Sequence, residues 1–193
     1  MCSHQIEKIN FNYTQRVGNL IETYNTLGDR KCAGETGEVF EKLIDDVVEY
    51  FPHLQSLKND YLTVECDGYK MSNVQVDRHI RSAIDNTLKS VIEGKTYLDS
   101  CYCKRAVVDF MEIAESSEIT DNVDFVILTG QISISQDTLN YYRAFCRKHT
   151  GRNFKLFVVN EQKSRNSKKP LYKEKFKLDI PELEKFYDYI ASL

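Results

Sequence analysis

A glutamate and a lysine stand two residues apart in the stretch SVIEGKTYLD, directly after an apolar pair. The stretch runs from Ser90 to Asp99, and the two charged residues are Glu93 and Lys95. In a β-strand, residues two apart project from the same face. A strand with this pattern either exposes a surface ion pair or holds a metal ion beside a reacting group.

A second carboxylate is expected beside this pair. Asp77 precedes Glu93 by sixteen residues on the strand predicted before it, and the AIDN turn between them favours a hairpin. Two carboxylates that share a site repel each other unless a cation lies between them, and Mg²⁺ prefers such oxygen ligands and bridges to phosphate. With Lys95 to orient a water and stabilise charge, the set is suited to phosphodiester hydrolysis.

The acid-x-lysine pattern alone is not specific. It occurs three times, as Asp29-Arg30-Lys31, Glu93-Gly94-Lys95 and Glu161-Gln162-Lys163. The first copy falls in LGDRKCAGETG, which is expected to be a glycine-rich loop, and the third falls in a basic loop beyond a strand. Only the middle copy follows a strand that carries an aspartate. The alternative for that copy is a cross-strand ion pair on an exposed edge, which contributes little to stability.

Hydrophobic periodicity predicts alternating helices and strands around these residues. Helices are expected over residues 5–27, 38–51, 100–117, 135–151 and 181–193. Asp99 is expected to cap the third of them. Extended stretches are expected on both sides of a turn at Asp67-Gly68, and over residues 72–80, 87–97, 123–129 and 154–159.

This order predicts an α/β fold, in which a mixed sheet is sandwiched between helices. The early strands should form an antiparallel meander, and the later strands should pair in parallel through right-handed β-α-β crossovers. Residues 1–193 are expected to form one domain, with its core at about 37–160, a basic loop at about 161–178 and a last helix at about 181–193.

Composition places the chain among ordinary globular proteins. Of its 193 residues, 41% are hydrophobic and 28% are charged, and no apolar run is long enough to cross a membrane. The start of the chain lacks the apolar segment of an export signal, so the six cysteines are expected to be reduced thiols and the location cytoplasmic. Cys101 and Cys103 lack the partners that a zinc finger requires.

Charge is distributed unevenly along the chain. Residues 1–100 carry 11 Lys and Arg against 16 Asp and Glu, whereas residues 143–177 carry 12 against two. The basic segment is suited to binding a polyanion such as nucleic acid, and the alternative is a solvated loop. The candidate phosphate-binding cations are Arg143, Arg147, Lys148, Lys163, Arg165, Lys168 and Lys169.

Two motifs carry a resemblance to a known family. An aspartate followed after fifteen residues by Glu-x-Lys on the next strand resembles the PD-(D/E)xK nuclease superfamily, and EGKTYLDSCYCKRAVVDF resembles a group of its type II restriction endonucleases. The resemblance covers about residues 37–160, and Val76 stands where the family usually has a proline. It implies that Asp77 and Glu93 bind Mg²⁺ and that Lys95 is the catalytic lysine.

The family often adds a glutamate from the preceding helix. On a helical wheel with Phe40 at zero, Glu41 falls at about 100°, beside the apolar stripe, and Glu38 at about 160°, on the water-facing side. Glu41 is therefore the candidate third metal ligand. The alternative is an ordinary solvated glutamate.

The resemblance implies a Mg²⁺-dependent, sequence-specific endonuclease of double-stranded DNA. One site cuts one strand, so cleavage of both strands suggests a two-fold homodimer on a palindromic site, or a small catalytic subunit in a heterodimer. Three alternatives stay open: a repair, recombination or RNA nuclease of the same chemistry, a catalytically silent binding module, and a plain α/β interaction domain.

Overall fold

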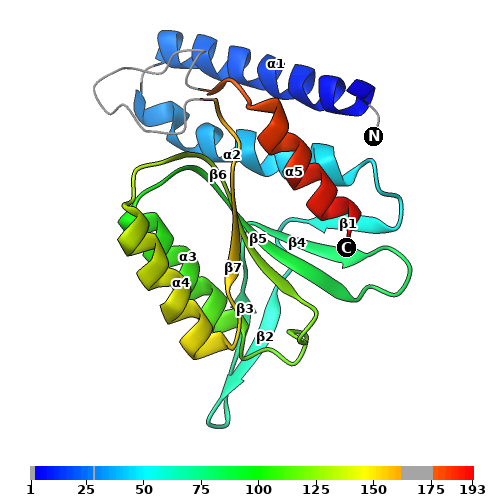
Figure 1. Cartoon of the computed structure of the whole chain (residues 1–193), viewed down its shortest axis with the longest axis vertical. Helices are drawn as coiled ribbons and strands as arrows, with labels where there is room; N and C mark the ends of the chain where they lie inside the picture. The colour runs from blue at the N-terminus through cyan, green and yellow to red at the C-terminus, as the bar shows by residue number, and fades with distance from the viewer. Residues whose placement is uncertain (1–2, 28, 162–175) are drawn as a thin grey trace.

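The protein is built around a five-stranded mixed sheet. Figure 1 shows the computed structural model, which describes residues 3–27, 29–161 and 176–193. The sheet order is β1 (Leu54–Leu57), β4 (Arg78–Ser82), β5 (Leu88–Leu98), β6 (Asp124–Ile132) and β7 (Phe154–Val158). The first three strands are antiparallel and the last three are parallel, as the sequence predicts for a mixed sheet.

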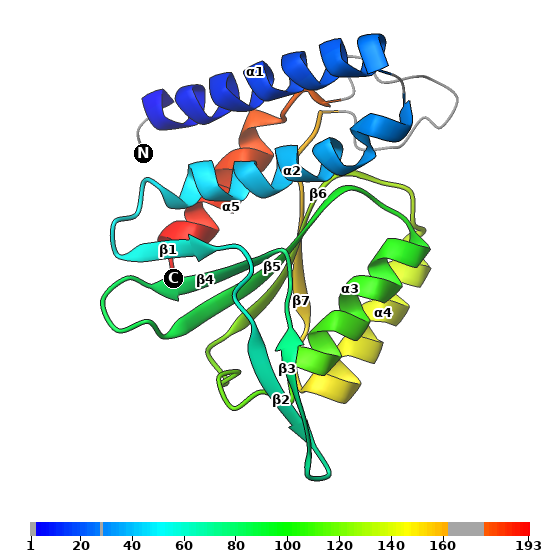
Figure 2. The same ribbon diagram turned by 180° about the vertical axis from the view of Figure 1, so that it is seen from behind.

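Helices cover both faces of the sheet. On one face lie α1 (Ser3–Leu27), α2 (Asp29–Val48) and α5 (Ile180–Ala191), and on the other lie α3 (Ser100–Ile113) and α4 (Gln136–Thr150) (Figures 1 and 2). Strand β6 is buried on both sides: Val126 and Leu128 pack toward the first group, and Phe125 and Ile127 toward the second. This three-layer arrangement confirms the predicted fold class.

Local capping groups explain where the two crossover helices begin and end. The Asp99 carboxylate accepts a hydrogen bond from the Tyr102 amide at 2.9 Å, which confirms its expected role as the N-cap of α3. Ser135 caps α4 in the same way. Gly151 ends α4 with a φ of 77°, a left-handed conformation that glycine adopts without steric cost.

The predicted antiparallel meander is wrong in one respect. Strands β2 (Leu62–Cys66) and β3 (Tyr69–Val74) form a separate hairpin, whose turn residues Asp67 and Gly68 both have positive φ. The hairpin packs its apolar side toward α3 and leaves the main sheet, where β1 takes the edge beside β4. The strand predicted at 72–80 is therefore broken at 75–77, where the chain passes from one sheet to the other.

The predicted glycine-rich loop at 27–37 is also wrong, because α2 already begins at Asp29. Each glycine in a helix costs about 1 kcal/mol relative to alanine. The apolar stripe of this helix, with Phe40, Leu43 and Val47 fully buried, offsets that cost. Among the described residues, no helix is long and apolar enough to cross a membrane.

Gly130 in β6 is expected to be essential for packing. A Cβ atom at this position would lie 2.5 Å from Phe40 Cζ, 2.7 Å from Asn160 Nδ2 and 2.8 Å from the Thr96 carbonyl oxygen. We expect Gly130→Ala to lower the free energy of unfolding by about 1–3 kcal/mol.

Chemical denaturation measures this effect, and Gly37→Ala is the matched control. A Cβ at Gly37 meets nothing within 4 Å and lies inside α2, so this variant should be more stable by about 0.5–1 kcal/mol. Equal changes in the two variants would contradict the close packing at Gly130.

Candidate active site

The pairing of β4 with β5 determines which side chains meet at the candidate site. Arg78 lies opposite Ile92 in the antiparallel register, so the preceding residue, Asp77, lies beside Glu93. Glu93 and Lys95 are two residues apart on β5 and project from the same face. The structure thus brings together the three residues that the sequence selects.

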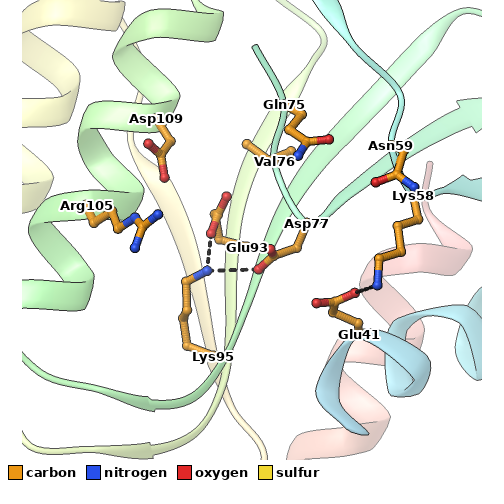
Figure 3. A pocket seen from close by; sticks show the side chains of 10 residues that line it. All are labelled: Glu41, Lys58, Asn59, Gln75, Val76, Asp77, Glu93, Lys95, Arg105 and Asp109. Carbon is orange, nitrogen blue, oxygen red and sulfur yellow. Dashed lines mark hydrogen bonds and ion pairs between the residues drawn. The ribbon is translucent and has the colours of Figure 1, made fainter. Parts of the chain in front are cut away.

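The three side chains are linked through one ammonium group. Lys95 Nζ donates a hydrogen bond to Asp77 Oδ2 at 2.9 Å and also pairs with Glu93 Oε2 (Figure 3). Asp77 Oδ2 accepts a further bond, at 2.9 Å, from the backbone amide of Gly94. Strand β5 therefore holds the carboxylate of Asp77 through both a side chain and its backbone.

Burial gives this group an unusual electrostatic state. Glu93 is only 3% exposed, and burial raises its pKa to about 7, although the charge of Lys95 opposes the shift. For Lys95, burial alone would lower the pKa, but the charges of Glu93 and Asp77 outweigh it and raise the pKa above its ordinary value. Lys95 is therefore protonated at neutral pH and presents a positive charge.

These residues lie in a polar pocket of about 460 Å³. Its lining consists of Glu41, Lys58, Asn59, Gln75, Val76, Asp77, Glu93, Lys95, Arg105 and Asp109 (Figure 3). Arg105 and Asp109 come from α3, and the sequence reasoning missed both. Their four-residue spacing, on the helix that follows the Glu-x-Lys strand, was the available signal, because such residues share one side of a helix.

Glu41 faces the same pocket and is already paired. Its Oε2 atom accepts a hydrogen bond from Arg78 Nη1 at 2.8 Å and lies 2.9 Å from Lys58 Nζ. Glu38 is exposed, as the helical wheel predicts. In this arrangement Glu41 is a partner of two cations, and its role as a metal ligand stays a prediction.

Arg78 is a third residue that the sequence reasoning missed. It is 3% exposed, and its guanidinium binds both carboxylate oxygens of Asp45, at 2.8 and 3.0 Å. It also donates to the backbone carbonyl of Asp77 at 2.7 Å. Arg78 thus links α2 to the backbone of Asp77. These contacts fix the start of β4, from which the Asp77 side chain reaches the pocket.

The predicted phosphate-binding cations lie outside the pocket or outside the described residues. Arg143 is on α4, with its guanidinium 5.7 Å from the centre of the Phe154 ring. Arg147 and Lys148 are exposed in the last turn of α4, and neither lines the pocket. Four of the candidate cations fall outside the described ranges, namely Lys163, Arg165, Lys168 and Lys169.

The donor set fits a hard divalent cation. Asp77 and Glu93 already converge on one positive group, the Lys95 ammonium. Within the described ranges, no three Asp, Glu, His or Cys side chains converge into a complete metal cage. Mg²⁺ does not need one, since it keeps several waters and uses one or two carboxylates. Asp77 and Glu93 are therefore the residues that would hold it.

Comparison with known proteins places the fold. No protein-family model matches the sequence, and no curated protein matches it. The α/β/α arrangement is a restriction-endonuclease-like fold. The chain is similar to the solved structure of NucC from P. aeruginosa ATCC27853 in its cAAA-bound form. The TM-score is 0.58 at 13% identity, over 100% of this chain and 91% of that chain.

The buried carboxyl of Glu93 predicts an unusual dependence of stability on pH. Because the folded-state pKa of about 7 lies above the ordinary value of 4.5, the folded state binds this proton more tightly. The contribution to stability is complete below the lower value and is lost as the pH rises through the higher one. Without metal, Glu93→Gln should be more stable than the wild type at about pH 8, by roughly 1–3 kcal/mol.

Urea denaturation in a chelating buffer at several pH values measures this difference, which should shrink toward about pH 4.5. Glu112→Gln removes an exposed carboxylate from α3 and serves as the control, with no such trend. A pH-independent difference between wild type and Glu93→Gln would contradict the raised pKa.

Proposed function

We propose that this chain is a Mg²⁺-dependent endonuclease that hydrolyses phosphodiester bonds of double-stranded DNA, and that it is a type II, sequence-specific enzyme acting as a homodimer. The observation that carries the proposal is the Lys95 ammonium held by Asp77 and Glu93 within the pocket. The restriction-endonuclease-like fold supports the proposal, because its neighbouring strands β4 and β5 bring these three residues together.

The proposed reaction is addition of water to phosphorus. The water oxygen bonds to phosphorus and releases one proton to solvent, the bond from phosphorus to the leaving sugar oxygen breaks, and that oxygen takes up a proton from solvent. Mg²⁺ held by Asp77 and Glu93 would supply Lewis-acid stabilisation of the charge that develops on the phosphate. The ammonium of Lys95 orients the water and stabilises a phosphate oxygen, and the carboxylates of Asp77 and Glu93 keep that ammonium in place.

Incubation of a long mixed-sequence DNA with the protein, with and without Mg²⁺, tests the proposal. We expect cleavage to require Mg²⁺. Its rate should fall by at least about 100-fold in Lys95→Ala, because this variant loses a hydrogen-bond donor to the charge that develops on the phosphate in the transition state. Lys89→Ala removes the same charge from the other part of β5, outside the pocket, and should leave cleavage unchanged.

The pattern of products separates the candidate functions. Discrete fragments support the type II assignment, and end mapping of those fragments gives the recognition sequence. A smear of products supports a nuclease without sequence specificity. DNA that stays intact while it is bound, with wild type and variants alike, would instead indicate a silent binding module.

Metal binding is tested separately from cleavage. At ten times its dissociation constant, Mg²⁺ should raise the free energy of unfolding of the wild type by about 1.4 kcal/mol, because only the folded state gathers the two carboxylates. Asp77→Asn should show a much smaller gain in the same denaturation experiment. An equal gain in the two proteins would place the metal elsewhere.

The comparison with NucC favours a second candidate, a nuclease of the same chemistry that works outside restriction. That structure contains bound cAAA and matches this chain over its whole length. If this chain also binds cAAA and is regulated by it, adding cAAA should change the rate of DNA cleavage, and the products should form a smear. Discrete fragments whose yield does not respond to cAAA would reject this candidate.

A further inference from the structure

Arg105 is the cation of the pocket whose hydrogen-bond donors stay available. Lys58 pairs with Glu41, and Lys95 pairs with the two central carboxylates. Within the described part of the chain, no residue forms a hydrogen bond or an ion pair with Arg105; its charge acts on Asp109, one turn further along α3, only at longer range, where it opposes the rise that burial causes in the pKa of that carboxyl. Figure 3 shows the Arg105 side chain extending from α3 toward Glu93 and Lys95.

The charge balance of the pocket gives this guanidinium a role. The lining contains four carboxylates, Glu41, Asp77, Glu93 and Asp109, against three cations, Lys58, Lys95 and Arg105. With all seven ionised, the net charge is −1, which repels a phosphodiester. A divalent cation at the two central carboxylates would change the sum to +1, whereas without Arg105 the sum would be only zero.

The position of Arg105 also differs from that of the other two cations. Lys58 approaches the pocket from the segment after β1, and Lys95 stands on β5. Arg105 comes from α3, on the opposite side of the central carboxylates from Lys58 (Figure 3). A substrate phosphate in the pocket would therefore meet Lys95 on one side and the Arg105 guanidinium on another.

We propose that Arg105 binds a phosphate group of the nucleic-acid backbone at the site of cleavage. A guanidinium is suited to this because it presents two parallel N–H donors to two phosphate oxygens, and lysine offers only a point charge. This inference rests on the proposed nuclease function and adds a substrate-contacting residue to it.

Binding of DNA with Ca²⁺ in place of Mg²⁺ tests the contact with binding, not cleavage, as the readout, because Ca²⁺ takes the same carboxylate oxygen ligands. A short fluorescein-labelled duplex is titrated with protein, and the dissociation constant is followed by anisotropy from about 50 to about 200 mM NaCl. Loss of one phosphate contact should reduce the slope of log Kd against log salt concentration by about 0.9 in Arg105→Ala. Arg105→Lys should keep most of the slope, because it keeps the charge.

Lys104→Ala is the matched control. Lys104 is exposed on the same helix and carries the same charge, but it does not line the pocket. The control should keep both the salt slope and the cleavage rate. Because Arg105 is exposed and makes no ion pair among the described residues, Arg105→Ala should change the midpoint of denaturation only slightly, through the charge that Arg105 presents to Asp109.

Single-turnover cleavage with Mg²⁺ completes the test. Arg105→Ala should cleave at least about 10-fold more slowly than the wild type, and Arg105→Lys should recover part of that loss. Wild-type slope and rate in Arg105→Ala, with normal cleavage by the wild type, would reject the Arg105 contact alone. Equal losses of salt slope and cleavage rate in Lys104→Ala would also reject the contact, because any positive charge on α3 would then explain the effect of Arg105. A wild-type protein that neither binds nor cuts DNA would reject the nuclease function itself.

Discussion

The antiparallel register of β4 against β5 is the constraint on which the candidate site depends. Asp77 precedes the first paired residue of β4. Its carboxylate accepts hydrogen bonds from the backbone amide of Gly94 and from the Lys95 ammonium. A shift of one residue in this pairing would turn every side chain of the strand to the opposite face. Packing against both helical layers and chemistry in the pocket therefore require the same register.

The buried guanidinium of Arg78 links β4 to helix α2, which covers that face of the sheet. A buried cation is tolerated only when it is well paired, and Arg78 meets Asp45, Glu41 and the Asp77 carbonyl. Helix α2 must therefore place its acids one turn apart above the start of β4. The same pairing engages Glu41 with the cations Arg78 and Lys58. Asp77 and Glu93 are therefore the two carboxylates that converge on Lys95.

The sequence predicts much of this architecture because its strongest signals are local. The extended stretches predicted at 87–97 and 123–129 match β5 and β6, the Asp67-Gly68 pair marks the hairpin turn, and Asp99 marks the start of α3. The failures concern tertiary choices. Nothing local indicates that the chain changes sheets between Val74 and Arg78, or that the packing of α2 carries the helix through its glycines.

The same distinction holds at the candidate site. Spacing along two neighbouring strands was enough to bring Asp77, Glu93 and Lys95 together. Arg78 and Arg105 could not be selected in this way, because their roles depend on which helix lies across from them.

The dimensions of the strands also limit how copies of this chain can associate. The outer strands of the main sheet, β1 and β7, have four and five residues, so they offer little backbone for continuing the sheet into a neighbour. The hairpin strand β3 is longer, and five of its six residues are exposed. Because β3 continues directly into Gln75 and Val76 in the wall of the pocket, a strand added to the edge of this hairpin would lie next to the pocket.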